Sequence, residues 1–198
     1  MENDLQKIQS KTFVLASKSP RRQDIFNGLG LNFRIETKDV DESFSEVLKA
    51  GEIPLFLSKV KASAFDGSLA ENEILVTADT VVWINGHALN KPENLAEAKQ
   101  MLQEISGATH EVFTAVSLTT ATKQHSFVEG TKVQFHELTE AEIDFYLSHY
   151  QPLDKAGAYG IQEFIGYIGI QKIEGDFYNV VGFPVQRFWR EVMSIIHL

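Results

Sequence analysis

Cysteine is absent from this sequence of 198 residues. Its absence excludes disulfides, thiolate zinc sites and a cysteine nucleophile, and it is compatible with a reducing compartment. Long apolar runs are lacking too, because no segment approaches the roughly 18 residues that a membrane-spanning helix requires. Residues 1–11 are polar and of mixed charge, unlike a secretory signal. We therefore expect a cytoplasmic protein that is neither exported nor inserted into a membrane.

Positive charge is scarce, since 18 Lys and Arg residues stand against 27 Asp and Glu residues, for a net charge of -9. Nucleic acids and anionic membranes usually meet a basic face, so neither is an expected partner. A phosphate compound would need the few cations gathered in one cleft, or a divalent metal held by carboxylates. The sequence also contains no Walker loop, dinucleotide fingerprint or serine-hydrolase elbow, and its six histidines lack the spacing of a zinc site.

Apolar periodicity predicts an α/β fold with a mixed sheet flanked by helices. Helices are expected after Pro20, from Pro54 to residue 67, from Asn94 to residue 107 and after the capping box of Thr139 and Glu142. The dipeptide Asn85-Gly86 predicts a hairpin, so the sheet is not purely parallel. The expected strands are 12–16, 31–35, 73–84, 111–120, 126–135 and 167–173, and the expected loops are 38–45, 154–160 and 175–184.

We expect one compact domain over residues 12–198, preceded by a flexible polar segment, residues 1–11. A chain of this length, with 43% hydrophobic and 23% charged residues, can bury one sizeable core. There are no internal repeats and no low-complexity tracts.

The turn from Ser17 to Arg22 is the first candidate site. Ser19 and Pro20 are typical of a helix start. Arg21 and Arg22 then lie in the first turn, where the helix dipole opposes positive charge by about 0.3 to 1 kcal/mol each. An anion bound at this helix start would reverse that mismatch, and serine hydroxyls with two guanidinium groups would form a phosphate site. A solvated surface pair of arginines is the alternative, and these residues alone do not decide between the two.

Asp79 is an ionisable residue inside an otherwise apolar, β-branched stretch, which is costly unless the carboxylate is paired or used. A strand-end aspartate bound to a turn is the simpler explanation. The remaining charged candidates also have ordinary interpretations as surface residues, turn formers or caps of a glycine-rich loop. They are Lys61, Lys91, the pair Asp41-Glu42, Asp176, Asp154 and Lys155.

Taken in order, the short motifs of this chain resemble the Maf family, a group of nucleoside triphosphate pyrophosphatases. The resemblance covers nearly the whole chain after residue 11, and the ordered combination of motifs is far more specific than any one of them. The motifs are LASKSPRR at 15–22, ADT at 78–80, KP at 91–92, THEV at 109–112, DKAGAYGIQ at 154–162, GD at 175–176 and NVVG at 179–182.

The resemblance implies an inosine-triphosphatase-like fold, with two lobes around a central cleft. It also implies a branch of the family, because Arg21, Thr80 and Gln162 match the branch that hydrolyses dTTP and UTP. A sister branch acting on 7-methyl-GTP has tryptophan, glutamine and glutamate at these positions. Gln162 makes chemical sense here, since a side-chain amide can pair with the donor and acceptor edge of uracil or thymine.

The resemblance also implies roles for the site residues. Asp79 would act as the base for a water that attacks the α-phosphorus, and Lys91 would neutralise developing charge. The triphosphate would be held by Ser17, Ser19, Arg21, Arg22 and Lys61. Mg²⁺ or Mn²⁺ would assist, with Glu42 and Asp176 as candidate ligands. A homodimer is implied as well, and the task would be nucleotide-pool housekeeping or cell-division arrest.

The chain departs from the family pattern at Asn90, Glu163 and Phe183, where the family usually has glycine, glycine and leucine. These departures bear on loop conformation and on the choice among pyrimidine bases, and they remove no charged site residue. Two alternatives stay open from the sequence. One is a pyrophosphatase for another base, such as CTP, 7-methyl-GTP or a damaged nucleotide. The other is a nucleotide-sensing division regulator without turnover, against which the intact set Asp79, Lys61 and Lys91 argues.

Overall fold

One mixed sheet of seven strands organises the molecule, in a computed structural model that describes residues 4–65 and 67–197. Its strand order is β2-β1-β3-β5-β6-β7, with β4 paired to β3. β1 pairs in parallel with β2 and with β3, and the other pairings are antiparallel, so the expected mixed sheet is confirmed. The strands are β1 (Thr12–Leu15), β2 (Phe33–Ile35), β3 (Glu73–Ile84), β4 (His87–Leu89), β5 (Thr109–Thr119), β6 (Gln124–Phe135) and β7 (Ile170–Glu174).

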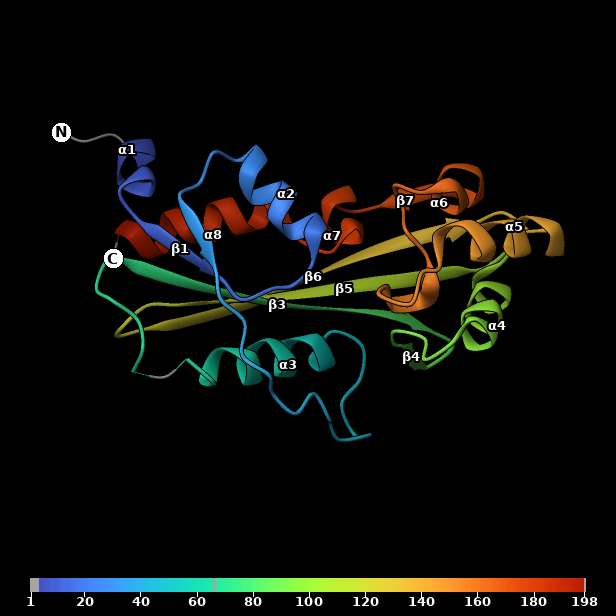
Figure 1. Cartoon of the computed structure of the whole chain (residues 1–198), viewed down its shortest axis with the longest axis horizontal. Helices are drawn as coiled ribbons and strands as arrows, with labels where there is room; N and C mark the ends of the chain where they lie inside the picture. The colour runs from blue at the N-terminus through green and yellow to red at the C-terminus, as the bar shows by residue number, and fades with distance from the viewer. Residues whose placement is uncertain (1–3, 66, 198) are drawn as a thin grey trace.

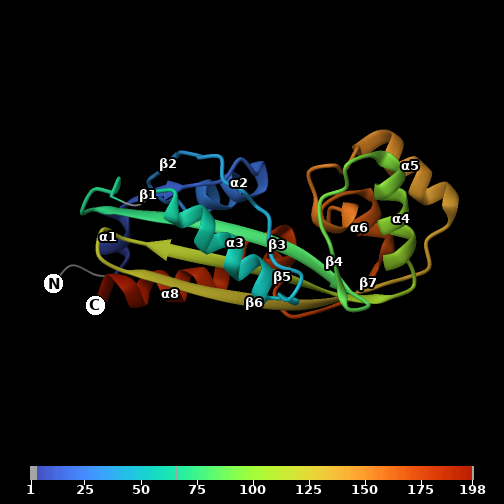
Figure 2. The same cartoon turned by 90° about the horizontal axis from the view of Figure 1, so that it is seen from below.

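The helices gather around the two ends of this sheet, as Figures 1 and 2 show. At one end, α1, α2 and α8 cover one face and α3 covers the opposite face. At the other end, α4, α5 and α6 form a separate group. The helices are α1 (Asp4–Gln9), α2 (Pro20–Gly28), α3 (Glu52–Ser63), α4 (Leu95–Ile105), α5 (Glu140–Tyr150), α6 (Phe164–Gly169), α7 (Phe177–Val181) and α8 (Val185–His197), with a 3-10 turn η1 (Ala156–Ala158).

Each helix group has its own apolar core, and the long strands β3, β5 and β6 contribute to both. The core under α2 and α8 is aromatic, because Phe13, Phe26, Phe183 and Phe188 are fully buried with ring centroids 4.9 to 6.2 Å apart. The core of the α4, α5 and α6 group is mainly aliphatic and includes the buried ring of Tyr146. The expected two lobes are therefore two helix groups built on one continuous sheet.

The local signals of the sequence explain several element boundaries. Asn85 and Gly86 have φ values of 50° and 86°, as a type I′ hairpin turn requires. Asn94 caps α4 by accepting a hydrogen bond from the Glu97 amide, and Thr139 with Glu142 forms the complete capping box of α5. Strand β3 has the bounds that its β-branched composition predicts.

Three segments differ from the expectation. Residues 4–9, expected as part of a flexible polar segment, form α1, whose Ile8 is buried in the core beneath α8. The strand expected over 167–173 begins only at Ile170, because residues 164–169 form α6. The loop expected over 175–184 contains α7, which Asp176 caps. Among the described residues, no helix has both the length and the hydropathy to cross a membrane.

Candidate active site

A cavity of about 690 Å³ lies between the two helix groups, and its size falls within the range of about 300 to 1,000 Å³ that is usual for ligand pockets. Its walls come from the turn before α2, the loop after β2, the middle of β3, the loop before α4 and the segments around η1 and α7. Ten of the sequence-predicted site residues line it, namely Ser17, Ser19, Arg21, Arg22, Glu42, Lys61, Asp79, Thr80, Lys91 and Gln162.

Ser19 and Pro20 begin α2 as their sequence predicts, but the Ser19 side chain forms no capping hydrogen bond. The turn is closed instead by Ser17, which is 7% exposed and accepts hydrogen bonds from the Ser19 amide at 3.2 Å and from Arg22 Nη1 at 3.4 Å. Ser17 therefore shapes the turn, while the Ser19 hydroxyl stays available at the pocket wall.

Arg22 connects three segments that are far apart in the chain. Its Nε donates to the carbonyl of Gly182 at 2.9 Å, its Nη1 to the carbonyl of Ala78 at 2.9 Å and its Nη2 to the hydroxyl of Thr80 at 3.1 Å. With the contact to Ser17, four of its five N–H groups are engaged within the protein. Burial lowers the pKa of Arg22 to about 10, which still leaves the guanidinium charged at neutral pH. Arg22 thus holds the pocket wall in place more than it offers donors to a ligand.

Thr80 belongs to the same arrangement. Its hydroxyl accepts from Arg22, lies 2.9 Å from the hydroxyl of Thr114 and lies 3.4 Å from the carbonyl of Gly182. The hydroxyl is therefore largely occupied by protein partners, and Thr80 fixes the position of its neighbour Asp79 in β3.

Asp79 and Glu42 share the ammonium group of Lys61. Lys61 Nζ lies 2.6 Å from Asp79 Oδ1 and 3.2 Å from Glu42 Oε2. Register in β3 and the position of Lys61 in the last turn of α3 bring the two side chains together across the layers. Burial raises the pKa of Asp79, and the positive charge of Lys61 offsets part of that rise. The Asp79 carboxylate is consequently a stronger base than a carboxylate at the surface.

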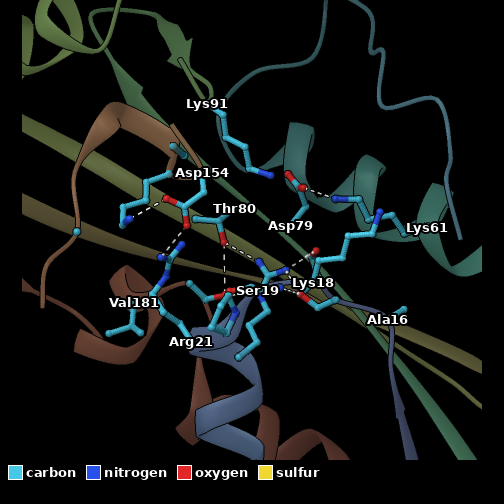
Figure 3. A pocket seen from close by; sticks show the side chains of 18 of the residues that line it. Ala16, Lys18, Ser19, Arg21, Lys61, Asp79, Thr80, Lys91, Asp154 and Val181 are labelled. Carbon is cyan, nitrogen blue, oxygen red and sulfur yellow. Dashed lines mark hydrogen bonds and ion pairs between the residues drawn. The ribbon is translucent and has the colours of Figure 1, made fainter. Parts of the chain in front are cut away.

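The side chains of two further lysines, Lys91 and Lys18, line the cavity. The Lys91 side chain extends toward the carboxylate of Asp79 in Figure 3. Within residues 4–65 and 67–197, the Lys91 ammonium has no hydrogen bond or ion pair, so it is free to meet a phosphate. Lys18, inside the motif of the turn, lines the same cavity and forms an exposed pair with Asp39 at 3.2 Å. Lys18 is not among the residues predicted from the sequence, although it lies between Ser17 and Ser19 in the same motif.

Arg21 differs from Arg22 in its contacts. Its single hydrogen bond to the described part of the chain runs from Nη1 to Asp154 Oδ2 at 3.1 Å. Its remaining N–H groups are available to a ligand. Gln162 lies on the part of the wall that follows η1. Its exposed side-chain amide makes no hydrogen bond to described residues, whereas its backbone carbonyl accepts a hydrogen bond from the Tyr167 hydroxyl. Both residues can therefore contact a bound molecule directly.

Asp176 is not brought to this cavity. It is the N-cap of α7, its side chain accepts a hydrogen bond from the Tyr178 amide at 2.8 Å, and it is not among the residues that line the pocket. The expectation that Asp176 shares a metal with Glu42 therefore has no geometric support, because its carboxylate is used to start a helix.

The donor set of the cavity suits a hard divalent cation that is also bound by phosphate. Glu42 and Asp79 already share one cation, the Lys61 ammonium, and carboxylate oxygens are the ligands that Mg²⁺ prefers. Among the described residues, no group of three or more His, Asp or Glu side chains gathers to hold a metal alone. A metal here would thus depend on ligand oxygens for the rest of its coordination, as Mg²⁺ commonly does with phosphates.

Comparisons with known proteins place the chain in a family. Residues 12–195 match the family described as Maf-like protein. A relative from Phocaeicola vulgatus, named dTTP/UTP pyrophosphatase, is 44% identical over 96% of this chain and 100% of the relative. A relative of the same name from Bacteroides thetaiotaomicron is 46% identical over 98% of this chain and 100% of the relative.

A solved structure was also found, titled as a nucleoside-triphosphatase / dITP/XTP pyrophosphatase from Mycobacterium abscessus. It covers 94% of this chain and 96% of its own, at 12% identity and a TM-score of 0.43.

Proposed function

The chain belongs to the Maf-like protein family, and from this premise we propose that it hydrolyses dTTP and UTP to the monophosphate and pyrophosphate. Relatives that align over almost the whole chain bear the name of that activity. The observation that carries the proposal is the partly buried Asp79 carboxylate, held by Lys61 in a cavity that Lys18, Arg21 and, unpaired among the described residues, Lys91 also line.

Asp79 is the proposed base. Lys61 fixes one of its oxygens, Oδ1, and within the described residues its other oxygen, Oδ2, accepts no hydrogen bond. Oδ2 can therefore accept the proton of a water molecule as that water attacks the α-phosphorus. The pKa raised by burial favours this proton transfer, since a base works best when its pKa approaches the working pH.

The cations of the cavity would stabilise the charge of the triphosphate and of the departing pyrophosphate. Lys91 and Lys18 supply ammonium groups, and the Ser19 hydroxyl and the free donors of Arg21 add hydrogen bonds. We further propose that Glu42 holds Mg²⁺ or Mn²⁺ together with substrate phosphates. Such an ion neutralises phosphate charge and makes pyrophosphate a better leaving group.

Gln162 is the proposed reader of the base. An amide offers one acceptor and two donors, so it can match the neighbouring carbonyl and N–H groups of uracil or thymine. We expect Gln162→Glu to weaken kcat/KM for UTP and dTTP more than for GTP, because glutamate loses the donor. Equal losses for all three nucleotides would contradict this role.

The central test is Asp79→Asn, which keeps the shape of the side chain and removes the base. We expect kcat for release of pyrophosphate from UTP to fall by at least about a hundredfold, within the usual contribution of a general base. Asp24→Asn is the control, because Asp24 is an exposed carboxylate on α2 that does not line the pocket. Retained turnover in Asp79→Asn, with the fold verified by circular dichroism, would remove Asp79 from the mechanism.

The position of attack is tested in water enriched in oxygen-18. Attack at the α-phosphorus places the label in UMP, whereas attack at the β-phosphorus places it in pyrophosphate. Mass spectrometry of the two products distinguishes these outcomes, and label in pyrophosphate or in orthophosphate would contradict the proposed reaction.

We also propose that the chain works as a homodimer, as its family resemblance implies. Exposed aromatic side chains support this, among them Tyr167 on α6, which is 72% exposed, and Phe177 and Tyr178 on α7. Light scattering with size-exclusion chromatography is expected to give twice the mass of the chain, and the mass of one chain would contradict the proposal.

A further inference from the structure

Arg21 and Gln162 line the cavity from different elements, α2 and the segment after η1. Besides its contact with the triphosphate, Arg21 keeps further free N–H groups that can meet the base. For Arg21 and Gln162 to contact one base, their relative position must be fixed. No hydrogen bond joins the two side chains among the described residues. A network of side-chain contacts instead runs from Arg21 to the segment that carries Gln162, through Asp154, Lys155, Glu163 and Tyr146. Any role of these contacts in base selection rests on the proposed function.

The first part of this contact network runs from Arg21 to Lys155. Arg21 Nη1 donates to Asp154 Oδ2 at 3.1 Å, and Lys155 Nζ donates to Asp154 Oδ1 at 2.7 Å. Both oxygens of Asp154 are thus engaged, one by Arg21 of α2 and one by its neighbour Lys155, and Figure 3 shows the contact between Arg21 and Asp154. Burial tends to raise the pKa of Asp154, but Lys155 and Arg21 outweigh it and lower the pKa overall, so the carboxylate is charged at neutral pH.

The second part of this contact network holds the segment that carries Gln162. Lys155 Nζ also lies 3.1 Å from Glu163 Oε1, and its side chain is only 10% exposed. Glu163 Oε2 accepts from the Tyr146 hydroxyl, which in turn accepts from the Gly160 amide at 3.1 Å. A Cβ at Gly160 would lie 2.6 Å from the Glu163 carboxyl group, so glycine leaves the room that this contact needs.

This arrangement contributes little to stability at its outer end, because Asp154 is 56% exposed and solvent screens an exposed ion pair. Its consequence is orientation. With Nη1 fixed to Asp154, the plane of the Arg21 guanidinium is set, and its free N–H groups keep a defined direction. Arginine has donors only, so a fixed Arg21 favours a base that presents a carbonyl oxygen over one that presents an amino group.

We propose that Asp154 and Lys155 are positioning residues for base selection, which hold Arg21 and the Gln162 segment as one unit across the pocket. They touch neither the phosphates nor the water in this mechanism. Loss of the Asp154 charge therefore affects discrimination between bases, while the chemistry at the α-phosphorus continues.

The test is Asp154→Asn, with kcat and KM measured for UTP, dTTP and CTP. We expect the ratio of kcat/KM for UTP to that for CTP to fall about tenfold, through KM for UTP, with kcat for UTP within about threefold of the wild type. Asp144→Asn is the matched control, since it removes an equally exposed aspartate that pairs with Lys99 at 2.7 Å outside the pocket. Its UTP to CTP ratio is expected to match that of the wild type.

A double-mutant cycle separates positioning from a general structural effect. If Asp154 acts through Arg21, the combination of Arg21→Ala and Asp154→Asn selects between UTP and CTP as Arg21→Ala alone does. An unchanged ratio in Asp154→Asn, a parallel fall for all nucleotides, or additive effects in the cycle each overturn the inference while the wild type remains active. A wild type that releases no pyrophosphate from UTP or dTTP overturns the proposed function itself, and the two failures are thus distinguishable.

Discussion

Arg21 and Arg22 are neighbours at the start of α2, but their guanidinium groups differ in how many protein groups they bind. Arg22 donates to the backbone carbonyls of Ala78 and Gly182 and to Thr80, whereas Arg21 makes one contact, to an exposed carboxylate. The sequence predicts an anion site from both, and it cannot separate them, because the carbonyls of Ala78 and Gly182 that hold Arg22 lie 56 and 160 residues away in the chain.

The first prediction contrasts the two arginines. Arg22→Lys keeps the charge and removes the fork that reaches three segments, so it is expected to lower the free energy of unfolding by about 2 to 4 kcal/mol. Arg21→Ala is expected to lower it by less than about 1 kcal/mol, since it removes only an exposed pair, and to lower kcat/KM for UTP about tenfold or more. Urea denaturation and steady-state kinetics check both. Equal stability of the two variants would contradict the structural role of Arg22.

The second prediction concerns His110, which is 1% exposed and packs between Phe135 and Tyr159. Its Nε2 lies 2.8 Å from the Tyr159 hydroxyl, and its Nδ1 has no partner among the described residues. Burial lowers the pKa of His110 to about 4. In the unfolded chain a histidine has a pKa of about 6.5, so the unfolded state binds more protons between these values.

The stability that a neutral His110 contributes is therefore fully present above pH 6.5 and is lost as the pH falls. By pH 5 the loss is about 2 kcal/mol. Urea denaturation of the wild type and of His110→Gln between pH 7.5 and pH 5 measures it, and the variant is expected to lack this part of the pH dependence. His125→Gln, at an exposed histidine paired with Glu191, is expected to keep it. Identical profiles for the wild type and His110→Gln would contradict the prediction.

At the scale of elements, the sequence predicts best where a short-range signal is complete. Strand β3, the hairpin at Asn85-Gly86 and the capping box of Thr139 all depend on residues within a few positions of one another, and the structure confirms them. Helices α6 and α7 have six and five residues, which is too short for helical periodicity to be recognised. Their stability comes from tertiary packing, and the sequence alone therefore presents them as a strand and a loop.

Dependence on tertiary contacts also explains why the predicted site does not show the contacts that join Asp154, Lys155 and Glu163 to Arg21. Asp154 and Lys155 are consistent with simple loop caps in the sequence, and Glu163 is only a departure from a family pattern. Their shared role depends on Arg21, 133 residues from Asp154, and on the packing of η1 against β3. Asp79 could be proposed from the sequence, because it belongs to the motif at 78–80 and needs no long-range contact to be noticed. Lys61 lies in none of these motifs, and its role was implied only by the family resemblance.

The third prediction tests how α6 supports the pocket. A Cβ at Gly166 would lie 2.4 Å from the carbonyl oxygen of Ile161, next to Gln162, so Gly166→Ala must displace that segment. We expect KM for UTP to rise and the melting temperature to fall. Gly28→Ala is the control, because a Cβ there meets nothing within 4 Å, and alanine in a helix is favoured over glycine by about 0.5 to 1 kcal/mol. Unchanged kinetics in Gly166→Ala would mean that α6 does not set the position of Gln162.

At the scale of the whole molecule, the two helix groups are not independent domains. Strand β3 carries Ile74 and Val76 into the core under α2 and α8, and it carries Val82 and Ile84 into the core of the α4, α5 and α6 group. Strand β5 does the same with Val116 and Val112, and the side chain of Ile25 packs against both cores. A separation of the groups would break hydrogen-bonded ladders in the middle of the sheet, which is unfavourable in an apolar environment.

The fourth prediction follows from this shared sheet. Calorimetry of the ligand-free protein is expected to show one transition, with a calorimetric enthalpy equal to the van't Hoff enthalpy. A non-hydrolysable α,β-methylene analogue of UTP binds between the groups, so at 100 times its Kd it is expected to stabilise the whole molecule by about 2.7 kcal/mol and to move that one transition upward. Two transitions, only one of which moves with the analogue, would contradict a single cooperative unit, because the groups would then unfold separately and the cavity between them would open before the cores are lost.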